Sequence, residues 1–109
     1  MIERQLKRKI TQKLDKGKAI ILIGPRQVGK TTLINSILEN REHLFLNGDD
    51  STVRNLLTNP NTEELKQIIG SHTTVFIDEA QRIENIGITL KLITDQFKSV
   101  QLLDLLHLN

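Results

Sequence analysis

Apolar residues recur at every fourth position at the start of the chain, at Ile2, Leu6, Ile10 and Leu14, with charged residues between them. This spacing gathers the four side chains on one face of a helix. Gly17 is a residue type that commonly ends a helix. Residues 1–17 are therefore predicted to form an N-terminal amphipathic helix whose apolar stripe packs on a sheet.

Short apolar runs further along the chain predict strands. Residues 19–23 read A-I-I-L-I, a run rich in β-branched residues that is typical of a strand buried in a parallel sheet. Residues 43–47 (H-L-F-L-N) and 73–77 (T-T-V-F-I) predict two further strands, and residues 99–103 are compatible with a fourth. Because helical patterns alternate with these runs, we expect an α/β protein with a mostly parallel sheet.

Apolar residues at helical spacing fill the segments between the predicted strands. Asn61 and Glu64 resemble a capping box at the start of one helix, and residues 48–51 supply turn and N-cap residues for another. Residues 59–60 (N-P), Gly70 and Gly87 are expected to interrupt the chain. The apolar residues of these predicted helices are Leu33, Ile34, Ile37, Leu38, Val53, Leu56, Leu57, Leu65, Ile68, Ile69, Leu90, Ile93 and Phe97.

Length and charge limit the classes of function. A chain of 109 residues is long enough for one domain at most. The 15 basic and 13 acidic residues give a net charge of +2, which is too small to indicate nucleic-acid binding by itself. Positive charge is nevertheless concentrated near the N-terminus, where it either contacts phosphate backbones or forms a solvated helix face. The basic residues there are Arg4, Lys7, Arg8, Lys9, Lys13, Lys16 and Lys18.

The chain has no cysteine, which excludes disulfides, thiolate metal sites and cysteine nucleophiles and suits a reducing cytoplasm. His43, His72 and His107 are far apart in the sequence and lack a metal-ligand spacing. No apolar run approaches the ~20 residues of a membrane span. We expect a cytoplasmic protein that has no membrane segment.

The strongest motif is residues 24–32, which read G-P-R-Q-V-G-K-T-T and fit G-x-x-x-x-G-K-[ST] between a predicted strand and a predicted helix. Glycines let the backbone N–H groups approach one anion, aided by the positive end of the helix. The alternative is a glycine-rich turn that binds no ligand. The predicted nucleotide-binding residues are Gly24, Pro25, Arg26, Gln27, Val28, Gly29, Lys30, Thr31 and Thr32.

A second motif follows the third predicted strand, which runs directly into Asp78 and Glu79 and resembles a Walker B element. Asp78 is predicted to hold Mg²⁺ opposite Thr31, and Glu79 to orient or deprotonate a water. The alternative is that the two acids cap the next helix. Gln81 is placed to sense a γ-phosphate or position water, with an ordinary exposed polar residue as the alternative.

The sequence predicts the roles of other polar residues near these motifs less specifically. Arg82 could meet a phosphate or a neighbouring subunit, or be an ordinary surface residue. Asp49 and Asp50 follow the second predicted strand at the edge where open α/β sheets bind ligands. Capping and turn formation are the favoured roles for this pair.

The two motifs and the segment I-G-I-T-L-K-L-I-T-D-Q-F at residues 86–97 together resemble the AAA-type ATPase domain of a large group of prokaryotic ATP-binding proteins. The similarity runs over residues 2–103. It implies a three-layer P-loop sheet of the additional-strand, catalytic-Glu type. The Walker B strand would lie beside the phosphate-loop strand or one strand away. Full-length members of the group carry a further C-terminal part.

The resemblance also implies ATP and Mg²⁺ as ligands and ATP hydrolysis as the reaction. The residues so implied are Gly24, Gly29, Lys30 and Thr31 for the phosphates, Thr31 and Asp78 for Mg²⁺, and Glu79 with Lys30 and Gln81 for catalysis. After residue 103 the chain departs from the group's small polar sensor segment and reads D-L-L-H-L-N, and Asp104 would repel a γ-phosphate. We therefore expect an incomplete domain, truncated after about four strands, that hydrolyses ATP inefficiently alone.

Alternative functions remain at this point. One is a nucleotide-binding module without useful turnover, because the sensor and arginine finger are missing from the pattern. Another is an ATP-dependent, nucleic-acid-associated protein that uses the basic N-terminal helix. A small-molecule kinase is a weaker rival, since an acid after Asp78 favours water as the acceptor. A protein partner or a homo-oligomer is compatible with each of these.

Overall fold

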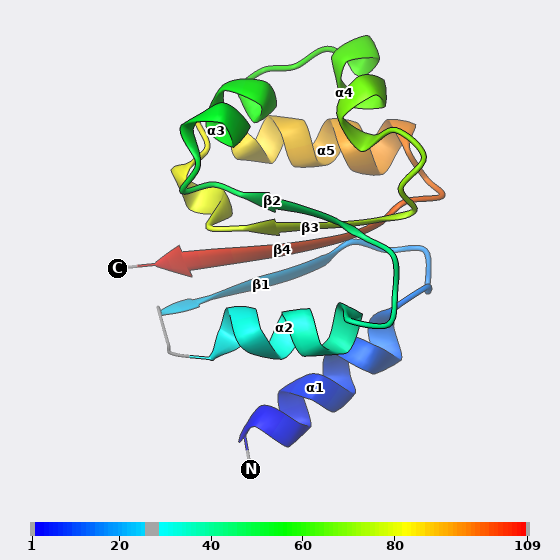
Figure 1. Ribbon diagram of the computed structural model, residues 1–109, viewed down its shortest axis with the longest axis vertical. Coiled ribbons are helices and arrows are strands. Elements are labelled where there is room, and N and C mark those ends of the chain that lie inside the picture. Colours follow the sequence, from blue (N-terminus) through cyan, green and yellow to red (C-terminus); the bar gives the residue numbers. More distant parts are fainter. Residues whose placement is uncertain (1, 26–28, 109) are drawn as a thin grey trace.

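Helices cover both faces of a parallel sheet (Figure 1). The computed structural model describes residues 2–25 and 29–108. The elements are α1 (Ile2–Lys13), β1 (Ile20–Pro25), α2 (Lys30–Leu38), β2 (Leu44–Asn47), α3 (Ser51–Leu57), α4 (Thr62–Ile69), β3 (Thr74–Asp78), η1 (Ala80–Arg82), α5 (Ile86–Gln96) and β4 (Gln101–Leu108). Over the described residues, four strands pair in the order β1-β4-β3-β2, and every pairing is parallel. The predicted α/β class is confirmed, and β3 lies one strand away from β1.

Alternate side chains of the strands supply two hydrophobic cores, one on each face of the sheet. Phe76 and Leu103 pack with Ile34 of α2 on the face that α1 and α2 cover. Val75 and Leu102 belong to the core on the opposite face, under α3, α4 and α5. The sheet is thus anchored on both sides.

The N-terminal helix packs as its periodicity predicts. Ile10 is buried, and Leu6 and Leu14 pack beside it in the core that includes α2, while the side chain of Ile2 lies outside the described residues. The basic residues from Arg4 to Lys18 are exposed to solvent. These side chains form a solvated basic surface on and after α1.

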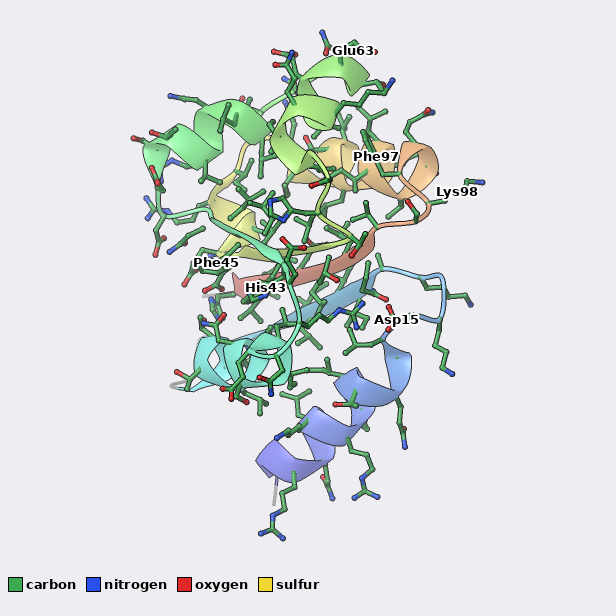
Figure 2. All side chains as sticks on the ribbon, turned by 45° about the vertical axis from the view of Figure 1, so that its right-hand side comes forward. Asp15, His43, Phe45, Glu63, Phe97 and Lys98 are labelled. Atoms are coloured by element: carbon green, nitrogen blue, oxygen red, sulfur yellow. The ribbon has the colours of Figure 1, made fainter. Side chains whose placement is uncertain are left out.

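Polar contacts tie the segment after α1 to the amino-terminal ends of the strands. Asp15, labelled in Figure 2, pairs with the Arg41 guanidinium, whose Nε also donates to Thr74 Oγ1 at 2.8 Å. The Asp15 backbone N–H donates to Gln101 Oε1 at 2.7 Å, and Gln101 Nε2 donates to the Lys18 carbonyl at 2.9 Å. These contacts join the starts of β1, β3 and β4 at the end of the sheet opposite the phosphate loop.

The strand before the phosphate loop is confirmed at Ile20–Pro25, but its predicted burial is wrong. β1 lies at the edge of the sheet among the described strands, and Ile21 and Ile23 are 48% and 61% exposed. An uninterrupted apolar run is typical of a strand with neighbours on both sides. Whether a strand has one neighbour or two depends on the order of the strands in the sheet. The apolar sequence of a single strand does not determine that order.

The last strand is longer than predicted and includes most of the segment that departs from the family pattern. β4 extends from Gln101 to Leu108, pairing with β3 through Asp104 and with β1 as far as Leu108. The predicted strand at residues 99–103 therefore starts two residues too early and ends five too soon. Asp104, the first residue of the segment that departs from the family pattern, lies inside the sheet opposite Ile21 and Ile77.

Asp104 is a buried acid on the same face of β4 as Leu102. Its side chain is 1% exposed, and neither carboxyl oxygen accepts a hydrogen bond from any residue that the structure describes. Burial without a partner disfavours the charged form and raises the pKa of the Asp104 carboxyl to about 8. The folded protein therefore keeps this carboxyl protonated at neutral pH.

This raised pKa predicts a pH-dependent stability. The ordinary pKa of the carboxyl is 3.8, so from about pH 4 to about pH 8 the unfolded chain releases a proton that the folded chain retains. The free energy of unfolding should fall as pH rises through this window, by up to about 1.4 kcal/mol per pH unit. Asp104→Leu should remove this decline and be most stabilising near pH 8, as measured by urea unfolding across the window.

The matched control for this prediction is Asp95→Asn on the exposed face of α5, where the carboxylate pairs only loosely with Lys91 at 3.5 Å. This variant should keep the wild-type dependence on pH. If wild type and Asp104→Leu differ by the same free energy at every pH, Asp104 does not titrate in this window and the interpretation is wrong.

The capping predictions are confirmed, whereas the predicted break at Gly87 is wrong. Asn61 and Glu64 form a reciprocal capping box at the start of α4, and the Asp50 side chain accepts from the Thr52 N–H at the start of α3. Gly87 is the second residue of α5. The turn before that helix is made instead by Asn85, whose φ of 58° lies in the left-handed region that asparagine tolerates.

None of the helices within the described residues is long and apolar enough to cross a membrane.

Candidate functional site

The phosphate-loop motif joins the carboxyl end of β1 to the start of α2, as predicted. Arg26, Gln27 and Val28 lie outside the described residues. Gly29 precedes α2 with φ of 99°, a left-handed conformation that costs glycine little. The N-cap residue of α2, Gly29, makes no side-chain hydrogen bond to the first turn. The first backbone N–H groups of a helix are a type of group that favours an anion.

Lys30 lies against the backbone of the preceding strand. Its Nζ donates to the Pro25 carbonyl at 3.2 Å, and a Cβ at position 24 would stand only 2.9 Å from that nitrogen. Gly24 therefore leaves room for the ammonium group at the start of the loop.

The two motifs meet through Thr31 and Asp78, which are 47 positions apart in the sequence. The Thr31 hydroxyl donates to Asp78 Oδ2 at 2.8 Å. Asp78 is the last residue of β3 and is 4% exposed, and its Oδ1 accepts the Glu79 N–H at 2.9 Å. A hydroxyl and a carboxylate are thus in direct contact at the carboxyl edge of the sheet, beside the loop.

Glu79 is held in an uncommon backbone conformation directly after β3. Its φ is 51°, which non-glycine residues adopt rarely and which often occurs at functional sites. The Glu79 carbonyl accepts the Arg82 N–H at 3.1 Å, closing the turn into η1. The side chain is buried, and its Oε1 accepts from Gln81 Nε2 at 2.8 Å. Gln81 therefore contacts Glu79 directly.

The turn after β2 closes the site from the other side of β3. The Gly48 N–H donates to the Asp78 carbonyl at 2.8 Å, and a Cβ at position 48 would stand 2.1 Å from the Glu79 carbonyl oxygen. Arg54 in turn donates to the Gly48 carbonyl at 2.9 Å. Only glycine permits this approach of the two backbones, so this turn fixes the position of the acid pair.

His107 at the end of β4 completes the cluster. Its Nδ1 lies 3.1 Å from Glu79 Oε1, and both side chains are almost fully buried. One ligand atom from each of Asp78, Glu79 and His107 falls within 4.8 Å of the others. The arrangement can therefore hold a divalent cation chemically. The His107 ring nitrogens make no hydrogen bond within the described residues, so the imidazole meets Glu79 only at ion-pair distance.

The remaining predicted residues lie outside this cluster. Thr32 is exposed on the first turn of α2. Arg82 forms an exposed ion pair with Asp49 at 2.8 Å, so the contact it makes here is with the β2–α3 turn. Asp50 caps α3, which agrees with the favoured capping role for these two acids.

Sequence reasoning missed two residues of the site, Gly48 and His107. Gly48 looked like an ordinary turn glycine, because the backbone that it approaches is more than 25 positions away. His107 was set aside with the unrelated histidines. One available sign was the apolar run L-L-D-L-L-H-L of residues 102–108, which continues past residue 103 and would carry a strand to the same edge of the sheet.

Comparison with known families gives one match. A family model described as AAA domain matches residues 16–103, which is most of the chain. No curated protein matches the sequence. The match spans the phosphate loop, the Asp78–Glu79 pair and the first part of β4.

Proposed function

Because the chain belongs to the AAA domain family, we propose that it binds ATP at residues 24–32 and hydrolyses it with the help of Asp78 and Glu79. The family indicates a nucleotide-binding, ATPase-type function. The observation that carries the finer proposal is the hydrogen bond from Thr31 Oγ1 to Asp78 Oδ2. It brings the phosphate loop and the acid pair to one edge of the sheet, close enough to share one nucleotide.

The phosphate groups would be held by the loop and the start of α2. The uncapped N–H groups of the first turn and the helix dipole favour an anion there. Lys30 supplies a point charge next to Gly24, where no Cβ blocks it. The ammonium would leave the Pro25 carbonyl and approach the β- and γ-phosphates.

Thr31 and Asp78 fit a Mg²⁺ ion that accompanies the nucleotide. Both present oxygen atoms, the ligands that Mg²⁺ prefers, and these oxygens are already in contact. When bound, the ion would offset negative charge on the β- and γ-phosphates. The Thr31 hydroxyl would release its hydrogen bond to Asp78 in order to turn toward the ion.

Glu79 would orient the attacking water. Its carboxylate follows Asp78 directly and is held by its neighbours, so it would present a hydrogen-bond acceptor to a water next to the terminal phosphate. Water would add to the γ-phosphorus as the bond to the bridging oxygen breaks, giving ADP and inorganic phosphate. Lys30 would stabilise the charge that develops on the transferring phosphoryl group.

Removing the loop lysine tests the nucleotide site. Lys30→Ala should weaken binding of a fluorescent ATP analogue at least about 10-fold, since it deletes a charge-assisted contact to phosphate. The matched control is Lys91→Ala, which removes an exposed lysine on α5 and should leave affinity unchanged. Equal affinity of wild type and Lys30→Ala would reject the site.

A further inference from the structure

The end of β4 carries a buried imidazole that the proposed reaction has not yet used. The His107 side chain is 4% exposed and that of Glu79 is 6% exposed, with 3.1 Å between His107 Nδ1 and Glu79 Oε1. A carboxylate buried to this extent needs hydrogen-bond donors. Gln81 Nε2 is one such donor. The imidazole of His107 lies within ion-pair distance of the same carboxylate, although neither of its ring nitrogens makes a hydrogen bond within the described residues.

Gln81 links the same two residues in a closed network. Its Nε2 donates to Glu79 Oε1 at 2.8 Å, and its Oε1 accepts the backbone N–H of His107 at 2.9 Å. One amide side chain thus holds the acid and the end of β4 at a fixed separation. The side-chain amide and the imidazole converge on a single carboxylate oxygen, Oε1, which restricts rotation of the carboxylate.

The sheet places this network next to the phosphate loop. His107 lies opposite Gly24 in the parallel register of β4 and β1. By strand alternation, the imidazole is on the same face as Leu103 and Leu105, the face that α2 covers. Thr31 and Asp78 meet on this face as well. His107 therefore joins the acid pair to the strand that leads into the loop.

We propose that His107 is a positioning residue that holds the Glu79 carboxylate, through Nδ1, in the orientation in which it directs water. This inference rests on the proposed ATPase function. Gln81 supports the same orientation from η1, so its role is to brace Glu79 and the His107 backbone. The Glu79 turn is already fixed by its left-handed backbone, and the Gln81 hydrogen bond together with the close imidazole restricts the remaining rotation of the side chain.

The steady-state kinetics of two variants test this role. His107→Leu removes the ring nitrogen that lies 3.1 Å from Glu79 Oε1, and His107→Asn keeps a polar N–H near the position of Nδ1. We expect His107→Leu to lower kcat at least about 10-fold with KM within about 2-fold of wild type, and His107→Asn to restore most of the rate. Equal losses in both variants, or a loss confined to KM, would contradict a positioning role.

The same assay separates this role from direct metal ligation. If His107 were a ligand of the cation, His107→Leu would raise the Mg²⁺ concentration needed for half-maximal rate, and saturating Mg²⁺ would restore kcat. That result would overturn the proposal. We expect the Mg²⁺ dependence of both variants to match that of wild type.

A second readout does not depend on turnover and covers the case in which His107→Leu fails to fold. In nucleotide-free protein, Glu79→Gln should change the imidazole ¹⁵N shifts of His107 and leave those of His43, on the approach to β2, unchanged (Figure 2). If wild type releases no phosphate, the ATPase proposal fails and this spectrum alone decides whether His107 holds Glu79. Unchanged His107 shifts in Glu79→Gln would overturn the inference.

Discussion

Glu79→Gln should reduce the rate of phosphate release at least about 100-fold and leave ATP affinity within about 2-fold of wild type. The substitution keeps the size of the side chain and its ability to accept a hydrogen bond from Gln81. It removes the negative charge with which the carboxylate would orient and polarise water. The two quantities are measured by phosphate release at saturating Mg²⁺ and ATP and by titration with a fluorescent nucleotide.

The control is Glu84→Gln, an exposed acid on the loop after η1, which should behave as wild type in both assays. A clear rate that persists in Glu79→Gln would show that another group directs the water. Absence of phosphate release from wild type, with ATP binding retained, would instead favour a nucleotide-binding module without turnover. The two measurements therefore separate the enzyme from the binding module.

Among the glycines whose surroundings the structure describes, Gly48 should tolerate substitution by alanine least. The added Cβ would stand 2.1 Å from the Glu79 carbonyl oxygen and 2.9 Å from its carbonyl carbon, both backbone atoms that a side-chain rotation cannot move away. Relief requires β2 and the Asp78–Glu79 turn to separate, which breaks the bond from the Gly48 N–H to the Asp78 carbonyl. We expect a loss of about 3 kcal/mol or more in the free energy of unfolding, measured with urea.

Any folded fraction of Gly48→Ala should also hydrolyse ATP poorly, because the acid pair would move relative to the loop. The control is Gly87→Ala within α5, where a Cβ would meet nothing within 4 Å, and where stability should stay unchanged or rise slightly. Gly48→Ala with wild-type stability and turnover would mean that the two backbones separate at little cost. The fixed position of Glu79 would then need another explanation.

Local chemistry made much of the site predictable. The order of strand, glycine-bounded loop and helix around Lys30 is a short-range pattern, and so is the acid pair at the end of an apolar strand. Parallel strands bring their carboxyl ends to one edge of a sheet. The two motifs and the parallel sheet together predict the contact between Thr31 and Asp78. The identities of these two residues alone would not predict it.

The errors arise where burial depends on distant segments. Ile21 and Ile23 are exposed because β1 lies at the edge of the described sheet. An apolar run has the same sequence pattern in an edge strand as in a central strand. The predicted fourth strand ends at residue 103, just before Asp104, and acidic residues are seldom buried inside a strand. In the structure β4 pairs with strands on both sides and continues past Asp104. His107 reaches the carboxyl edge of the sheet only through this extension.

Helix α1 lies before the residues that match the family, yet it contributes to the core that supports the candidate site. The match begins at residue 16, whereas Ile10 is 2% exposed and belongs to the same core as Ile34 and Phe76. A polypeptide that starts at residue 16 would lack Ile10, so the core under α2 would be exposed to solvent. The first turn of α2 is proposed to bind the phosphates. The hydrophobic core under α2 therefore includes a helix that lies before the matched residues, and removing α1 should weaken the support of α2, the helix proposed to bind the phosphates.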